Sequence, residues 1–198
     1  FDGDNGYGFV IPDDKNLCVD VYIPVKKTMG AKKGDKVVAV ITEYPEKRRN
    51  PEGKIIEILG RKFDLRAEEL SIIKSYDYDL DFNEKVLKEV EKVPTFVSES
   101  ELVGRVDYTN DFVVTIDGED SRDFDDAVCV KKFNNYYELS VHIADVSHYV
   151  NFNSAIGKEA FKRSTSVYFP ERVIPMLPKK LSNGICSLNE NELRLTLS

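Results

Sequence analysis

Short runs rich in apolar residues recur through the first sixty positions of the chain, and turn residues separate them. Runs of this length bounded by turn residues are typical of strands. The runs cover residues 7–11, 17–23, 36–42 and 54–59, and the turns between them contain Pro, Gly, Asp and Asn. This spacing predicts a small all-β barrel.

From Phe63 onward the apolar residues recur at helical spacing. Residues 65–73 predict a short helix, and Asn83 or Asp81 can cap a second helix that ends before Pro94. Strand-like runs then resume at residues 112–116, 127–132 and 137–143, and Ser154 can cap a helix at residues 155–163. The order of elements predicts an α+β protein, with a helical connector at residues 62–110 between two domains.

Composition and charge narrow the class of protein. The 198 residues are 41% hydrophobic, and no apolar run approaches the ~18 residues that span a bilayer. No basic and apolar leader begins the chain, so we expect a cytoplasmic protein without membrane contact. The three cysteines are widely spaced and form no CxxC pair, which favours neither a disulfide framework nor a zinc site. We expect them to be buried thiols.

The net charge of −7 argues weakly against nucleic-acid binding, but it is unevenly distributed. Residues 1–62 contain 12 Lys and Arg against 10 Asp and Glu, whereas residues 63–110 contain 6 against 12. The deficit in residues 111–198, 10 against 13, comes largely from one acidic stretch. Bound cations would neutralise that stretch.

The acidic stretch at residues 117–126 places six carboxylates within ten residues, directly after an apolar run. Oxygen ligands of this kind suit a hard cation, Mg²⁺ or Mn²⁺. A regular strand would point Asp123 and Asp125 to one face and Asp126 to the other, so joint coordination requires a bend. An EF-hand is excluded, because its sixth and twelfth positions would be Arg122 and Val128. A solvated acidic loop remains an alternative.

His142, Asp145 and His148 lie three residues apart and offer a second candidate metal site. The alternation before them is typical of a strand, and histidine is more often a packed hydrogen-bonding residue. We therefore favour a structural role for this trio.

Two motifs in the first segment resemble the paired strands of cold-shock domains: GYGFVIPDD at residues 6–14 and DVYIP at residues 20–24. The resemblance implies a five-stranded OB-type barrel at residues 1–61, with its first strand truncated, that binds RNA. Tyr7, Phe9 and Tyr22 would stack on bases, although burial in the barrel core is the alternative. Pro24 departs from the family pattern. The basic residues 47–49 contact phosphate or form a solvated hairpin tip.

Four motifs in the last segment resemble the start of the catalytic domain of the ribonuclease II and ribonuclease R family. In order they are TIDGEDSRDFDDAV at 115–128, VHIADVSHYV at 141–150, SVYFPERVIPMLP at 166–178 and LSNGICSL at 181–188. The resemblance implies that residues 111–198 are the truncated N-terminal part of an RNB exoribonuclease domain. It also implies a processive 3′-to-5′ exoribonuclease that releases nucleoside 5′-monophosphates.

Residue by residue, Asp117, Asp123, Asp125 and Asp126 match the family's catalytic aspartates, which hold up to two Mg²⁺ ions. Tyr168 matches a tyrosine that stacks on a base near the 3′ end, while Glu119 and Asp120 are expected to face solvent. The partner implied is RNA that is single-stranded at its 3′ end, and we expect a monomer. Because the family's catalytic domain is longer, we expect this piece alone to be inactive. The alternatives are a non-enzymatic RNA-binding module or RNA chaperone, and a metal-binding structural domain.

Overall fold

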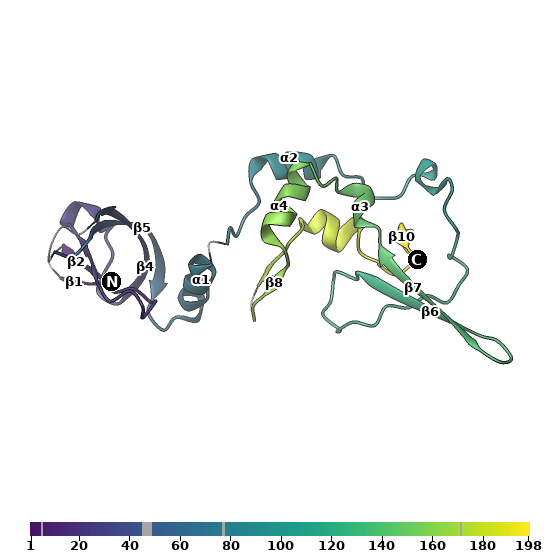
Figure 1. Ribbon diagram of the computed structural model, residues 1–198, viewed down its shortest axis with the longest axis horizontal. Helices are drawn as coiled ribbons and strands as arrows, with labels where there is room; N and C mark the ends of the chain where they lie inside the picture. Colours follow the sequence, from purple (N-terminus) through teal and green to yellow (C-terminus); the bar gives the residue numbers. More distant parts are fainter. Residues whose placement is uncertain (5, 45–48, 77, 171) are drawn as a thin grey trace. The chain divides into compact units, whose positions relative to one another are not determined.

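The computed structural model describes residues 1–4, 6–44, 49–76, 78–170 and 172–198. It divides the chain into two compact units, unit 1 at Phe1–Asp79 and unit 2 at Leu80–Ser198 (Figure 1). Each unit has its own hydrophobic core. The mixture of helices and strands confirms the α+β class.

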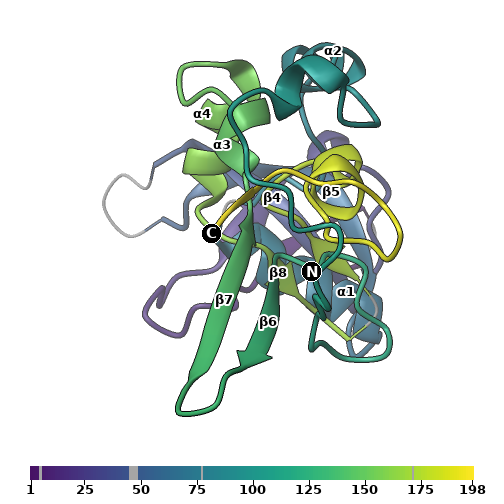
Figure 2. The same ribbon diagram turned by 90° about the vertical axis from the view of Figure 1, so that its right-hand side faces the viewer.

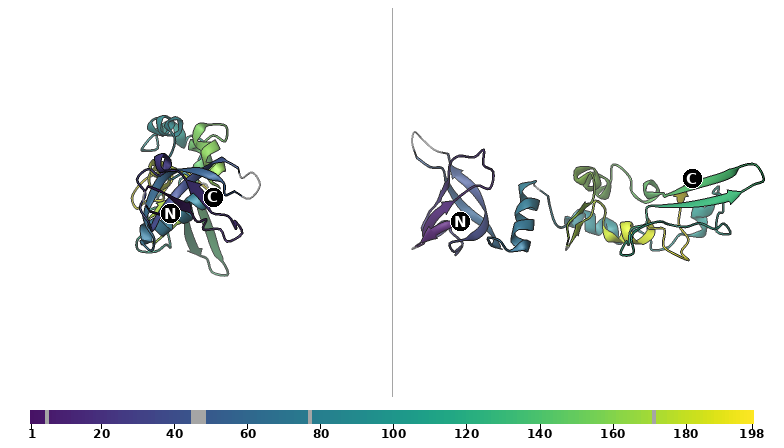
Figure 3. Two further views of the ribbon diagram at one scale, coloured as in Figure 1. Left: turned by 90° about the vertical axis from the view of Figure 1, so that its left-hand side faces the viewer. Right: turned by 90° about the horizontal axis from the view of Figure 1, so that it is seen from below.

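Unit 1 is a five-stranded sheet built from β1 Asp2–Asp4, β2 Tyr7–Val10, β3 Val21–Ile23, β4 Asp35–Glu43 and β5 Glu52–Arg61. The strands follow the order β1-β2-β3-β5-β4 and curve round a small core (Figure 3). Among the strand pairs formed by the described residues of this sheet, only β3–β5 is parallel. This is the strand order of an OB-type barrel.

The barrel of unit 1 is not closed by a strand ladder among the residues that the structure describes. The seam between its first and fourth strands is bridged by a backbone hydrogen bond of 2.9 Å from Gly34 N to Phe1 O. Val21, Ile23 and Ile55 form the buried core. The predicted strand at 17–23 is shorter than expected, because Leu17 and Val19 lie exposed in the connection that precedes β3.

Helix α1 Leu65–Ser75 follows the sheet, and the Asp64 side chain caps it by accepting from Arg66 N and Ala67 N. Within unit 1 the helix contacts β4 and β5. Ala67 and Ile73 are the buried residues of this helix. The helix predicted at 65–73 is thereby confirmed.

Unit 2 packs two helices over a core to which several loops contribute. Helix α2 Glu84–Glu91, capped by Asn83, lies beside α4 Ala155–Arg163, capped by Ser154 (Figure 1). Both predicted helices are confirmed. The core joins Val86 of α2 and Ile156 of α4 to the π-helical turn η3 Leu181–Ile185. A 3₁₀ turn, η2 Glu99–Leu102, and the short helix α3 Val146–Tyr149 complete the helical elements.

Strands β6 Asp126–Lys132 and β7 Tyr137–Ala144 form a long antiparallel hairpin, to which β10 Thr196–Leu197 adds a third strand (Figure 2). A separate two-stranded hairpin joins β8 Val167–Tyr168 and β9 Val173–Ile174. The predicted strand at 112–116 is wrong: only Val114 pairs with Val128. Phe112 and Ile116 are 85% and 83% exposed, so no packing extends this bridge.

The three cysteines are free, and two of them, Cys129 and Cys186, are buried as expected. The expectation is wrong for Cys18, which is exposed after the Asp14–Leu17 turn. No helix in the described part of the chain is long and apolar enough to cross a membrane.

Candidate functional site

The acidic stretch forms a loop that is closed at its base by one β-bridge. Val114 N donates to Val128 O at 2.9 Å, and Val128 N donates to Val114 O at 2.8 Å. Asp126 is the first residue of β6, so the other carboxylates lie on irregular backbone before it. The bend that joint coordination of an ion requires is therefore present.

Residues 122–125 of this loop are fixed by contacts with distant parts of unit 2. Phe124 N donates to the hydroxyl of Ser187 at 3.0 Å, and that hydroxyl lies 3.2 Å from the Arg122 carbonyl oxygen. Leu188 N donates to Phe124 O, and Ala144 N donates to Asp125 O, each at 2.9 Å. Ser187 is completely buried. Hydrogen bonds from residues 187–188 and from Ala144 thus fix the backbone that presents Asp123 and Asp125.

Asp125 lies close enough to the other three candidate aspartates to be repelled by their charges. Partial burial, and then the negative charges of Asp123, Asp126 and Asp117, raise the pKa of Asp125. Within the described residues, no basic side chain pairs with Asp117, Asp125 or Asp126. Glu119 and Asp120 are exposed, as expected. The loop therefore concentrates negative charge that the chain itself leaves unbalanced.

By chemistry this set of carboxylates fits a hard divalent cation, because its donors are oxygens and its excess charge is negative. In this structure, however, the carboxylates do not converge on a common point. Across the described ranges, no three His, Cys, Asp or Glu side chains converge in an arrangement that could hold an ion. Binding would require side-chain rotation about a backbone that is already fixed at residues 122–125.

Tyr168 reaches the acidic loop from the β8–β9 hairpin. Its hydroxyl donates to Asp123 Oδ2 at 2.9 Å, while 65% of the residue remains exposed. This hydrogen bond to the carboxylate, together with partial burial, raises the pKa of Tyr168, so the hydroxyl stays protonated at neutral pH. The sequence singled out both residues, and the structure brings them together.

The three candidate RNA-binding aromatics of unit 1 share the outer face of its sheet. Phe9 lies opposite Tyr22 in the β2–β3 register, with their ring centroids 5.7 Å apart. Tyr7 lies 6.3 Å from Tyr22 and is 49% exposed. Val21 and Ile23, on either side of Tyr22, are buried. The alternative that these aromatics form the barrel core is therefore wrong.

Gly8 lets this outer face form. It alternates with Tyr7 and Phe9 and points inward, where a Cβ would lie 2.5 Å from Gly3 Cα. Any larger residue would push β1 away from β2. Of the basic residues at 47–49, two lie outside the described residues and Arg49 is exposed.

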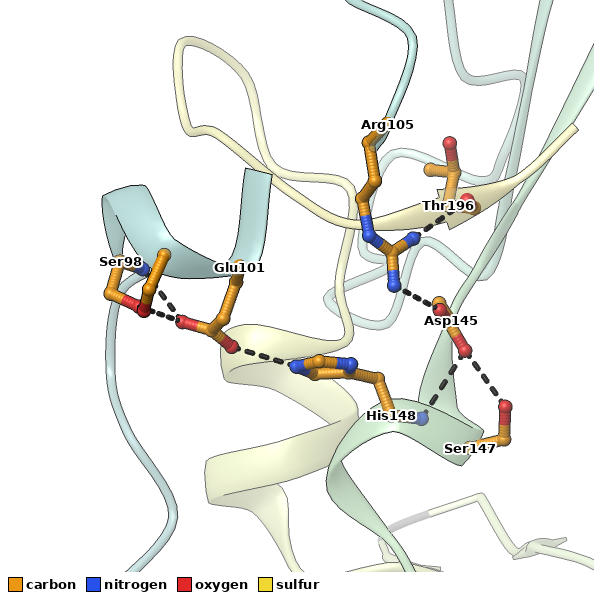
Figure 4. A network of polar contacts seen from close by, with 8 residues as sticks. Ser98, Glu101, Arg105, Asp145, Ser147, His148 and Thr196 are labelled. Atoms are coloured by element: carbon orange, nitrogen blue, oxygen red, sulfur yellow. Dashed lines mark hydrogen bonds and ion pairs between the residues drawn. The ribbon is translucent and has the colours of Figure 1, made fainter. Parts of the chain in front are cut away.

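Among the described residues, His142, Asp145 and His148 do not form a metal site, because their side-chain groups contact different side chains. The contacts of Asp145 and His148 are drawn in Figure 4. His142 Nδ1 lies 2.8 Å from Ser198 Oγ, and its ring packs edge-on against Tyr108. Asp145 accepts from Arg105 Nη2 at 2.7 Å. These contacts support the structural role favoured for this trio.

A polar network joins the segment around η2 to α3 (Figure 4). His148 Nε2 lies 2.9 Å from Glu101 Oε1, and Asp145 caps α3 through its contact with His148 N. Hydrogen bonds from Ser98, together with the contact to His148, lower the pKa of Glu101 to about 2. Sequence reasoning missed Glu101 and Arg105, because their partners lie 40 to 47 residues away.

Comparison with known proteins places these features in context. Residues 9–83 match the cold shock domain, and residues 105–198 match the RNB domain. Ribonuclease R of Thermotoga maritima is 48% identical over 201 residues, which cover 100% of this chain and 28% of the relative. The solved structure of Mycoplasma genitalium RNase R in complex with double-stranded RNA matches with a TM-score of 0.82 at 31% identity, over 90% of this chain and 32% of that one.

The fold also occurs in a protein described as a pseudonuclease, yeast Ssd1. That match has a TM-score of 0.67 at 22% identity and covers 93% of this chain and 24% of that one. At this identity it shows the fold alone. The fold therefore does not by itself establish a nuclease.

The outer aromatic face in unit 1 and the acidic loop in unit 2 define a protein in which a cold shock domain is followed by an RNB domain. Within that class the chain is a ribonuclease R homologue. It spans about a quarter of the length of the curated relatives that it matches, 28% in one case and 24% in another.

Proposed function

We propose that the chain supplies the RNA-binding face and the acidic part of the active site of a 3′-to-5′ exoribonuclease. The observation that carries the proposal is the acidic loop, in which partial burial, and then the charges of three other aspartates, raise the pKa of Asp125. It lies within the segment that matches the RNB domain. A nuclease that hydrolyses phosphodiesters with divalent cations needs such an unbalanced carboxylate cluster.

The residues of this chain would divide the work between two surfaces. Tyr7 is exposed and Phe9 and Tyr22 are half-buried, and their rings offer a surface on which bases of single-stranded RNA can stack regardless of sequence. Tyr168 offers a further ring beside the acidic loop. Stacking without base-specific hydrogen bonds suits a general RNA-degrading enzyme.

Asp117, Asp123, Asp125 and Asp126 are the residues that would hold Mg²⁺, or Mn²⁺ in its place. When bound, such ions would activate the attacking water and stabilise the leaving 3′-oxygen. The fixed backbone at residues 122–125 would keep Asp123 and Asp125 near the scissile phosphate. We further propose processive release of nucleoside 5′-monophosphates from a single-stranded 3′ end, by a cytoplasmic monomer.

A chimera provides the test. This chain would replace the matched segment of Thermotoga maritima ribonuclease R, to which it aligns over its full length. We expect Mg²⁺-dependent release of nucleotides from the 3′ end of a labelled RNA. Asp125→Asn should lower the rate about 100-fold or more while RNA affinity survives, because metal ligation supplies several kcal/mol to the transition state.

Asp120→Asn is the matched control, because Asp120 is an exposed carboxylate of the same loop. Its rate should stay within about threefold of the unmutated chimera, well under the effect expected for a metal ligand. Equal rates for Asp125→Asn and the unmutated chimera would disprove the assignment.

A second candidate is RNA binding without catalysis. Two observations favour it. Among the described residues, no three carboxylates converge on a common point, and the fold occurs in a pseudonuclease. A folded chimera that binds RNA with no metal-dependent cleavage would support this candidate instead.

A further inference from the structure

One hydrogen bond joins the acidic loop to a hairpin 45 residues further along the chain. Tyr168 Oη donates to Asp123 Oδ2 at 2.9 Å. Both partners are candidate site residues, one as a metal ligand and the other as a base-stacking ring. The bond therefore links the base-stacking ring directly to a candidate metal ligand.

Both ends of this bond stand on fixed backbone. Phe124, next to Asp123, is hydrogen-bonded to Ser187 through its N–H and to Leu188 through its carbonyl. Tyr168 pairs with Val173 across the hairpin, and Phe169 N donates to Arg172 O at 2.8 Å. The neighbouring Ile174 is buried and anchors the hairpin. With the backbone hydrogen-bonded near both ends, the hydroxyl restricts the rotation of the Asp123 carboxylate.

A carboxylate has two oxygens and about four lone-pair positions, so one hydrogen bond leaves it able to bind a cation. Donors that contact metal ligands in this way orient them, and losing one typically costs about 10-fold to 100-fold in metal affinity. Asp123 benefits from such orientation because it lies close enough to Asp125 for their charges to repel.

We propose that Tyr168 is a positioning residue for the acidic site, whose hydroxyl orients the Asp123 carboxylate toward a bound divalent cation. The inference rests on the proposed function, since it assumes that the loop binds a cation. It assigns the hydroxyl a role separate from that of the ring. Movement of the ring on binding a base would then be transmitted directly to a metal ligand.

The test is a Mn²⁺ titration of the chain itself, followed by electron paramagnetic resonance. Tyr168→Phe keeps the ring and removes only the hydroxyl, and it should weaken Mn²⁺ binding about 10-fold to 100-fold. Tyr136→Phe is the control, because Tyr136 is an exposed tyrosine that stacks on Phe133 at the tip of the β6–β7 hairpin. It should leave Mn²⁺ affinity unchanged.

A double-mutant cycle separates positioning from a general structural effect. If the hydroxyl acts through Asp123, Tyr168→Phe should have no further effect on Mn²⁺ affinity in an Asp123→Asn background. In EDTA, affinity for a short oligoadenylate should be unchanged by Tyr168→Phe and reduced by Tyr168→Leu. Unchanged or tighter Mn²⁺ binding in Tyr168→Phe, or additive effects in the cycle, would overturn the inference.

The outcome also distinguishes this inference from the proposed function. Mn²⁺ binding that is lost in Asp125→Asn but unaffected by Tyr168→Phe would overturn the positioning role alone. No Mn²⁺ binding by the unmutated chain, or binding indifferent to Asp125→Asn, would overturn both.

Discussion

Ser187 shows how a single buried hydroxyl can hold an irregular loop in place. It accepts from Phe124 N and lies next to the Arg122 carbonyl oxygen, 65 residues earlier in the chain. Ser187→Ala would leave a backbone N–H without a partner in a site that excludes water. We expect a loss of about 1 to 3 kcal/mol in the free energy of unfolding of unit 2.

Urea denaturation would measure this loss. Ser100→Ala, at an exposed serine in η2, is the control and should change the free energy of unfolding by less than about 0.5 kcal/mol. Equal effects of the two substitutions would mean that Ser187 does not stabilise the loop.

Glu101 makes the stability of unit 2 depend on acid. Its pKa in the folded protein, about 2, lies below the ordinary value of 4.5, chiefly because of hydrogen bonds from Ser98. A carboxylate with a depressed pKa stabilises the fold above its unfolded pKa. That contribution should therefore disappear as the pH falls from 4.5 toward about 2.

Unfolding free energies of the wild type and Glu101→Gln, measured across this pH range, would show the effect. The advantage of the wild type should shrink steadily toward acid, because glutamine does not titrate. A constant difference between the two proteins would contradict the assignment to Glu101.

At the scale of elements, helix α2 depends on its first residues. The Asn83 side chain accepts from Lys85 N and Val86 N, and Val86 is completely buried in the core of unit 2. Asn83→Ala should therefore cost about 0.5 to 2 kcal/mol of unit 2 stability. Asn134→Ala, in the turn of the β6–β7 hairpin, is the control and should cost much less stability. Differential scanning calorimetry of the two variants would measure the difference.

The helices could be predicted from the sequence because their signals are local. Asn83 and Ser154 mark the starts of α2 and α4, and the apolar residues that follow repeat at helical spacing. The strands β6 and β7 were equally visible from alternation. In the acidic loop, the identity of the candidate residues was readable for the same reason: they lie within ten consecutive positions.

Contacts between distant residues could not be predicted in this way. Ser187 and Tyr168 contact the acidic loop from 63 and 45 residues away, and nothing in their local sequence shows these partners. The strand expected at 112–116 failed for a related reason. Its apolar, strand-like run was present, but only Val114 has a paired residue across β6. Periodicity shows what a segment can form and not whether a partner is available.

At the scale of the whole molecule, the net charge of −7 disfavours contacts with RNA phosphates. Counterion release makes phosphate contacts strongly dependent on salt, with a slope of about −0.7 per contact on single strands. Stacking of bases on aromatic rings does not release counterions and adds about 1 to 3 kcal/mol per base. An acidic protein can therefore bind RNA if stacking carries much of the affinity.

The aromatic face of unit 1 provides that stacking under our proposal. Replacing Tyr7, Phe9 and Tyr22 together by leucine should lower the affinity for labelled oligouridylate at least about tenfold, because ring stacking is lost. The slope of log affinity against log salt should stay the same, since the substitutions remove no positive charge. Fluorescence anisotropy at several KCl concentrations would measure both the affinity and the slope.

Tyr76→Leu, at an exposed tyrosine of the same unit, is the control and should change neither the affinity nor the slope. A changed slope with little loss of affinity would show that these rings do not stack on RNA and that charge governs binding.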